Sequence, residues 1–89
     1  MSITYTSADS ALIEGGLREF IAENFYVEDE LDPTESLTGA GVIDSTGVLE
    51  VVTWIEDTFS IVVPDADILP ENLDSVQSIV RYVTGALNG

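Results

Sequence analysis

Three stretches of this chain place their apolar residues three and four positions apart, and this spacing restricts the fold more than any other feature of the sequence. The stretches run over residues 10–25, 44–59 and 74–87. In each of them the apolar side chains fall on one face of a helix, and no segment shows the sustained alternation of a half-buried strand. The spacing therefore predicts three amphipathic helices that bury their apolar faces against one another.

The prolines of the chain, Pro33, Pro64 and Pro70, lie between these stretches, where they separate helices rather than interrupt them. After Pro64, residues 65–69 suffice for one or two helical turns. Eighty-nine residues can bury only one modest core. We therefore expect an all-α fold, a small four-helix bundle that forms a single domain over residues 1–89. It should contain three main helices, at 10–25, 44–59 and 74–87, and one short helix at 65–69.

A long connection, residues 26–43, joins the first two predicted helices. It contains acidic residues, Pro33, Gly39 and Gly41, and its scattered apolar positions can anchor it to a core. A connection of this length without a helix or strand of its own is uncommon in a compact domain and is often functional. It leads directly to Asp44, at the start of the second helix.

The absence of cysteine and histidine limits the chemistry that the chain can perform. It removes thiolate nucleophiles, disulfides, the commonest zinc ligands and the usual general base, which argues against an enzyme. We expect no metal site either, because the acidic groups around Asp65, Asp67 and Glu71 lack the glycine and terminal glutamate of a calcium-binding loop. No run of apolar residues is long enough for a membrane span, and the N-terminus does not resemble a secretion signal, so we expect a cytoplasmic protein.

The sequence has seventeen acidic side chains and only two basic ones, Arg18 and Arg81, so its net charge is −15. Such a surface repels nucleic acid and anionic lipid, since phosphate binding depends on lysine and arginine. Its natural partners carry basic patches. The simpler interpretation is that the charge only keeps the protein in solution, and charge alone does not separate the two.

An Asp-Ser pair stands at the predicted start of each main helix, at residues 9–10, 44–45 and 74–75. Asp is a preferred N-cap, because its carboxylate accepts from free backbone N–H groups and opposes the positive end of the helix dipole. By local physics alone, all three pairs are helix caps. The second pair differs in its setting, because the long glycine-containing loop delivers Ser45 onto the helix N-terminus.

In that setting the chain resembles the acyl carrier protein family. The family pattern is a leucine, a short loop, a glycine, two apolar residues and an Asp-Ser pair that opens an apolar helix, and it is matched by Leu37, Gly41, Val42, Ile43, Asp44 and Ser45. The turn at residues 63–65, Val-Pro-Asp, and the helix pattern of residues 75–83 are also similar to the family. The resemblance covers residues 35–85.

The resemblance implies that Ser45 is the attachment site of a 4'-phosphopantetheine arm, supported in the motif by Asp44 and Gly41. A phosphopantetheinyl transferase would supply the arm from coenzyme A. The thiol of the arm would then carry an acyl group as a thioester, loaded by a ligase and used by synthases and transferases of fatty acid, lipid or polyketide biosynthesis. The chain itself would be a monomeric carrier without catalytic residues.

Two alternatives stay open, an aminoacyl or peptidyl carrier of a specialised pathway and an unmodified acidic interaction domain. A docking surface for basic partners is expected on the outward face of the second helix, at Thr46, Leu49, Glu50, Thr53, Glu56 and Asp57. These carboxylates could equally form a solvated helix face. The family usually has leucine or methionine at position 46, methionine at 53 and often an acidic residue at 47, so this surface is less apolar than is usual. Trp54, near the edge of the buried stripe, is expected to pack rather than to anchor a partner.

Overall fold

The computed structural model describes residues 10–25, 27 and 30–88, and within them the chain is helical and forms no strand. The expectation of an all-α bundle with three main helices and one short helix is confirmed. The helices are α1 Ser10–Asn24, α2 Ser45–Phe59, α3 Pro70–Leu73 and α4 Val76–Asn88. A turn of 3-10 helix, Asp65–Asp67, precedes α3.

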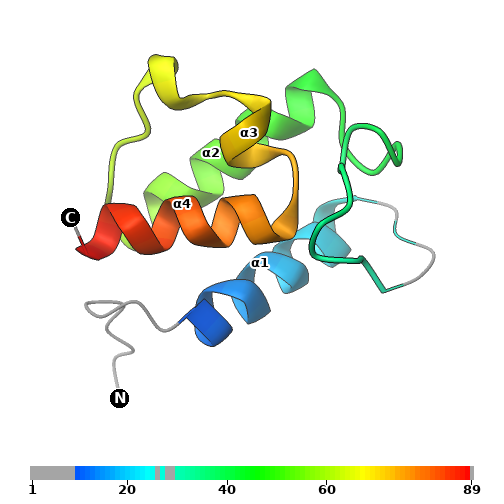
Figure 1. The fold of residues 1–89 in the computed structure, drawn as a ribbon, viewed down its shortest axis with the longest axis horizontal. Coiled ribbons are helices and arrows are strands. Elements are labelled where there is room, and N and C mark those ends of the chain that lie inside the picture. The colour runs from blue at the N-terminus through cyan, green and yellow to red at the C-terminus, as the bar shows by residue number, and fades with distance from the viewer. Residues whose placement is uncertain (1–9, 26, 28–29, 89) are drawn as a thin grey trace.

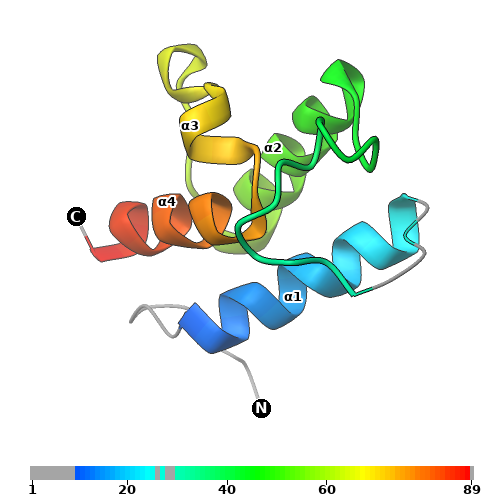
Figure 2. The same cartoon turned by 45° about the vertical axis from the view of Figure 1, so that its right-hand side comes forward.

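Helices α1 and α4 pack side by side and run antiparallel, so that the last turn of α4 lies at the same end of the bundle as the first turn of α1 (Figure 1, Figure 2). The short helix α3 packs on α4. All four helices and the connection before α2 contribute to a single apolar core. Its buried members are Ile13, Leu17, Ile21, Leu37, Ile43, Val51, Val52, Ile55, Phe59, Val63, Leu73, Val76, Ile79, Val80 and Val83.

The short helix lies later in the chain than the predicted range, residues 65–69. Residues 65–67 form only a 3-10 turn, and the α-helical turn is α3, which begins at Pro70. Leu69 is extended, with φ −127° and ψ 148°, as expected of a residue before proline, which sterically disfavours the helical region. Proline fits the first helical position, because it has no N–H group to leave unpaired there. The proline that was interpreted as a separator therefore starts the helix.

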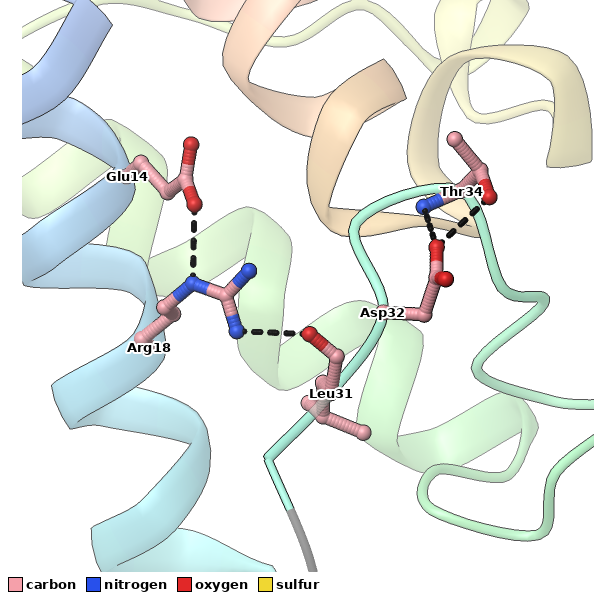
Figure 3. A network of polar contacts seen from close by, with 5 residues as sticks. All are labelled: Glu14, Arg18, Leu31, Asp32 and Thr34. Atoms are coloured by element: carbon pink, nitrogen blue, oxygen red, sulfur yellow. Dashed lines mark hydrogen bonds and ion pairs between the residues drawn. The ribbon is translucent and has the colours of Figure 1, made fainter.

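Arg18 fixes the connection between α1 and α2 against α1 (Figure 3). Its Nε donates to Glu14 Oε2 at 2.9 Å within the helix, and its Nη1 donates to the backbone oxygen of Leu31 at 2.8 Å. In the next turn, Asp32 Oδ1 accepts from the backbone N–H of Thr34 at 2.8 Å and from its hydroxyl at 2.6 Å. Those two hydrogen bonds, the hydroxyl first, lower the pKa of Asp32 from its ordinary value. One of the two basic residues of the chain thus has a structural role.

Candidate functional site

Ser45 is the first residue of α2 and is exposed to solvent. The residue before it, Asp44, is the N-cap: its backbone is extended, at φ −111° and ψ −171°, and its Oδ1 accepts from the backbone N–H of Gly47 at 2.8 Å. An aspartate in this position satisfies one of the N–H groups that the first turn of a helix leaves without a partner. The helix thus begins one residue later than the spacing indicated, and Ser45 stands on its first turn.

Of the other two Asp-Ser pairs, only the pair at residues 74–75 lies wholly within the described residues. Asp9 lies outside the described residues, and Ser10 is an exposed residue at the start of α1. Ser75 is 7% exposed, and its Oγ accepts from the backbone N–H of Ser78 at 3.0 Å, so the serine itself caps α4. The expectation that Asp74 caps this helix was wrong. Burial and capping leave Ser75 unsuited to modification, whereas the hydroxyl of Ser45 is accessible.

Asp74 instead holds the connection that leads to Ser45. Its carboxylate accepts hydrogen bonds from the Ser36 hydroxyl, from the Thr38 hydroxyl at 2.9 Å and from the Thr38 backbone N–H at 3.0 Å, and its backbone oxygen accepts from Leu37 N–H at 2.7 Å. Burial of the carboxyl works against ionisation, but the hydrogen bonds from Ser36 and Thr38 outweigh it and lower the pKa of Asp74. An ionised side chain at the start of α4 therefore clamps residues 36–38.

Between this clamp and Ser45 the chain makes a tight turn. Leu37 is fully buried and its backbone oxygen accepts from the N–H groups of Val42, at 2.9 Å, and Ile43, at 3.3 Å. Gly41 makes the turn possible with φ +75°, a left-handed conformation that glycine adopts without steric cost. The buried side chains of Leu37 and Ile43 fix both ends of the turn, which sets the direction in which the chain enters α2.

Gly47 lies where α1 meets the first turn of α2. A Cβ atom on Gly47 would come within 3.0 Å of Phe25 Cε1 and of Ile43 Cβ, which is tighter than nine in ten real Cβ contacts. The sequence alone showed this glycine only as a departure from the family pattern. The structure offers a reason, because Phe25 and Ile43 would have to shift to make room for a side chain at position 47. This contact brings the end of α1 against the start of the helix that carries Ser45.

The surface around Ser45 is an open hollow, and an apolar cleft lies close to it. The hollow is lined by Asn24, Phe25, Thr38, residues 41–47 and Glu50. The cleft has a volume of about 110 Å³ and is lined by Thr38, Val48, Ile68, Leu69, Pro70, Leu73 and Asp74. Thr38 lines both, and Val48 lies one helical turn beyond Ser45 on α2. The sequence gives no sign of the cleft, since its walls come from α2, α3 and the connections on either side of α2, together with Asp74.

Asp67 supports the wall of the cleft that Ile68 and Leu69 form. Its Oδ2 accepts from the Tyr82 hydroxyl at 2.8 Å, and its backbone oxygen accepts from Asn72 Nδ2 at 2.9 Å. Burial, followed by the hydrogen bond to Asp67 and the charge of this carboxylate, raises the pKa of Tyr82 to about 12. These contacts tie the 3-10 turn to α4 and α3.

The six side chains expected on a docking surface do not all share one environment. Thr46, Leu49, Glu50, Thr53 and Asp57 are exposed on α2, and Leu49 exposes 57% of its surface. Glu56 is half-buried, and its Oε2 accepts from the backbone N–H of Val63 at 2.8 Å, which fixes the chain after α2. Trp54 is packed as expected, stacked on Phe20 with ring centroids 5.5 Å apart.

The described residues contain no group of three or more acidic side chains arranged to hold a metal ion. Among the helices of the described segments, none is long and apolar enough to cross a membrane. The described residues thus form a small helical domain in which a clamped loop presents an exposed serine on a helix N-terminus beside an apolar cleft.

Comparison with known proteins identifies the family. The model of the phosphopantetheine attachment site family matches residues 16–83. The chain is 33% identical to the acyl carrier protein of Myxococcus xanthus over 75 residues, which are 83% of this chain and 92% of that protein. It is 35% identical over 75 residues to the acyl carrier protein of Beutenbergia cavernae, covering 83% and 89% of the two chains. It is also 35% identical over 69 residues to the D-alanyl carrier protein of Streptococcus sanguinis, covering 76% and 87%. The chain belongs to the acyl carrier protein family.

It is therefore a phosphopantetheine carrier, and 4'-phosphopantetheine is its prosthetic group. When bound, the group supplies a thiol for thioester formation, which a chain without cysteine cannot supply itself. The start of α2 fits its phosphodiester. The N–H groups of Ser45 and Thr46 have no acceptor within the helix, and the positive end of the helix dipole favours an anion there.

Proposed function

We propose that Ser45 is the residue that carries the phosphopantetheine arm and that the chain transports acyl groups as thioesters between biosynthetic enzymes. The observation that carries the assignment is the accessibility of Ser45 directly after the N-cap Asp44, at the end of the turn built on Leu37 and Gly41. The family resemblance and the geometry agree on this residue, whereas Ser75 is buried as a helix cap.

In the proposed modification, the Ser45 oxygen forms a new bond to the phosphorus next to pantetheine in coenzyme A. The pyrophosphate bond breaks, 3',5'-ADP leaves, and the transferase accepts the hydroxyl proton. The chain supplies the hydroxyl and an anion-stabilising helix terminus, and the transferase supplies the base.

The experiment is incubation of the protein with coenzyme A and several broad-specificity phosphopantetheinyl transferases, followed by intact-mass measurement and mapping of the adduct. We expect one phosphopantetheine group on wild type, on Ser10→Ala and on Ser75→Ala. We expect none on Ser45→Ala. An adduct on Ser45→Ala, or wild type that gains no mass with any transferase, would sink the assignment.

The apolar cleft favours an acyl cargo. Five of its seven lining residues are aliphatic, and Val48 in its wall lies one helical turn from Ser45, so the cleft can shield the start of an acyl chain from water. At about 110 Å³ it is smaller than the roughly 300–1,000 Å³ of pockets that enclose drug-sized ligands, so a long chain would extend beyond it. We place the carrier in fatty acid, lipid or polyketide biosynthesis, where loading ligases, synthases and transferases act on such thioesters.

One observation favours an aminoacyl cargo as the second candidate. The Asp74 carboxylate lines the same cleft, and an ammonium group next to the thioester would be attracted to it. Carriers of D-alanine are among the relatives. Loading the arm with a short acyl or an alanyl group would separate the two. If the cleft binds an acyl cargo, loading should shift the amide resonances of Ile68 and Leu73. If it binds an alanyl cargo, loading should shift the amide resonance of Asp74, and this shift should disappear in Asp74→Asn.

A further inference from the structure

The hollow around Ser45 reaches from the start of α2 to the end of α1. It has a volume of about 790 Å³, which falls within the roughly 300–1,000 Å³ of pockets that hold small molecules. Among the residues that line it, Phe25 is the one aromatic side chain, and it directly follows the last residue of α1. Because Ser45 itself lines the hollow, any group attached to this serine starts inside it.

Contacts on two sides fix the ring of Phe25. It meets Phe20 edge-on, with ring centroids 6.1 Å apart. Its Cε1 and Cζ atoms lie 3.0 Å and 3.3 Å from the position that a Cβ atom would take on Gly47. Gly47 is two residues after Ser45, which corresponds to about 3 Å along the helix axis. The ring therefore lies against the first turn of α2, and it stays only half-buried, so part of it is open to the hollow.

Most other side chains in the wall of the hollow are polar. Asn24 donates a hydrogen bond from Nδ2 to the backbone oxygen of Phe20 at 2.9 Å, which leaves its Oδ1 as an acceptor. Thr38 and Thr46 are exposed and contribute hydroxyl groups. The apolar cleft, which shares Thr38 with the hollow, is different, because five of its seven lining residues are aliphatic. The hollow thus combines one aromatic contact with hydrogen-bonding groups, whereas the cleft offers mainly aliphatic contacts.

The phosphopantetheine arm contains groups that match the hollow. Its phosphate is followed by a carbon that bears two methyl groups, and then by a hydroxyl group, two amides and the thiol. The methyl groups are the branched apolar part of the unloaded arm, and they gain free energy when an aromatic ring shields them from water. The amides would lose hydrogen bonds to water in an aliphatic cleft. The unloaded arm therefore suits the hollow better than the cleft.

We propose that Phe25, with Gly47 and Val42 beside it, forms a binding site for the dimethyl-bearing part of the arm on Ser45. Asn24 Oδ1 accepts a hydrogen bond from an amide N–H of the arm. This assignment rests on the attachment at Ser45, and it adds the place where the unloaded arm lies, toward α1 and away from the cleft. A tethered group has an effective concentration of about millimolar at a site within its reach, so a weak contact is enough to occupy the site.

The test uses the full chain, modified with coenzyme A that carries an isotope label in its pantetheine part. Adduct mapping on Ser45 comes first, so the lack of a contact in a confirmed adduct is a failure of this binding site alone. We expect nuclear Overhauser contacts between the methyl protons of the arm and the ring protons of Phe25. The methyl resonances should lie upfield of those in free coenzyme A, because the ring shields them. The thiol end should stay mobile, with order parameters below about 0.6.

A matched pair of variants separates the ring of Phe25 from general effects on the fold. Phe25→Leu keeps an apolar side chain but removes the ring, so the methyl resonances should return to their positions in free coenzyme A. Phe59→Leu makes the same change at the opposite end of α2, outside the hollow, and should leave the upfield shift intact. Gly47→Ala, which requires Phe25 or Ile43 to shift, should change the methyl resonances of the arm. Circular dichroism checks that each variant is folded.

Three results would overturn the assignment. The first is a wild-type adduct whose methyl resonances equal those of free coenzyme A. The second is a set of contacts from the arm to Ile68 and Leu73, which would place the unloaded arm in the cleft. The third is an equal loss of the upfield shift in Phe25→Leu and Phe59→Leu. The first two results are measured on wild type and do not depend on the folding of any variant.

Discussion

At the scale of single residues, the glycines of this chain have different roles that the structure separates. A Cβ atom on Gly47 would meet Phe25 and Ile43 at 3.0 Å, so these neighbours would have to shift to accept a side chain there. Gly15 in α1 and Gly85 in α4 have no atom within 4 Å of the position that a Cβ would occupy. The first is required by packing, and the other two only lower the stability of their helices.

This difference predicts opposite effects of the same substitution. Gly47→Ala should lower the free energy of unfolding by about 1–3 kcal/mol, because Phe25 or Ile43 must move. Gly15→Ala and Gly85→Ala should raise it by about 0.5–1 kcal/mol, since alanine loses less backbone entropy in a helix. Chemical denaturation of the three variants measures the effects. A stabilised Gly47→Ala variant would contradict the proposed contact between α1 and α2.

At the scale of the elements, the connection between α1 and α2 is held by residues distant in sequence. Ser36 and Thr38 bond to Asp74, and Pro33 accepts from Gln77 N–H at 2.8 Å. Because the hydrogen bonds lower the pKa of Asp74, its clamp contributes stability that is fully present above the ordinary carboxyl pKa. That contribution is lost as the pH falls below about 4, through the lowered pKa of the folded state.

The clamp can be tested with Asp74→Asn. The variant should lose about 1–2 kcal/mol of unfolding free energy at pH 7, as expected for weakened hydrogen bonds to a charged acceptor. Wild type should lose stability between pH 4 and pH 2 as Asp74 becomes protonated. This loss should be smaller in Asp74→Asn, which has no carboxyl group at position 74. Asp65→Asn, with the same change in charge, serves as the control. If both variants have the same stability at pH 7, the hydrogen bonds of Asp74 contribute nothing measurable.

Much of the bundle could be predicted because helix faces follow local spacing. The stripes that contain Leu17, Ile55 and Val83 indicated which faces are buried. The loop before Asp44 indicated that Ser45 stands at the start of a helix. The role of Asp74 could not be predicted, because its partners lie 36 to 38 residues away and a local pattern interprets it as a cap. The walls of the cleft also come from separate elements, so no spacing reveals them.

At the scale of the whole molecule, the net charge of −15 opposes folding. The compact state brings these carboxylates closer together than the unfolded chain does, and the ion pair between Arg18 and Glu14 offsets little of this repulsion. The acidic surface is tolerated, and we infer that it serves to attract basic partners.

Salt should therefore stabilise the protein. Raising sodium chloride from 0.01 M to 1 M shortens the screening length from about 30 Å to about 3 Å and weakens the repulsion. The thermal midpoint at pH 7 should rise over this range, and the rate at which a transferase modifies Ser45 should fall, because the same screening weakens attraction between partners. A midpoint that is independent of salt would mean that the carboxylates are too far apart to repel appreciably.

The clamp between Asp74 and residues 36–38 also relates the attachment site to the order of synthesis. A ribosome-bound chain that ends before residue 74 has made Ser45 and α2 but lacks the side chain that holds the preceding turn in place. The serine would then emerge on an unanchored segment. If Ser45 carries the arm as we propose, a transferase meets the finished geometry only after the C-terminal part of the chain has left the exit tunnel, so we expect modification of Ser45 to follow the translation of Asp74.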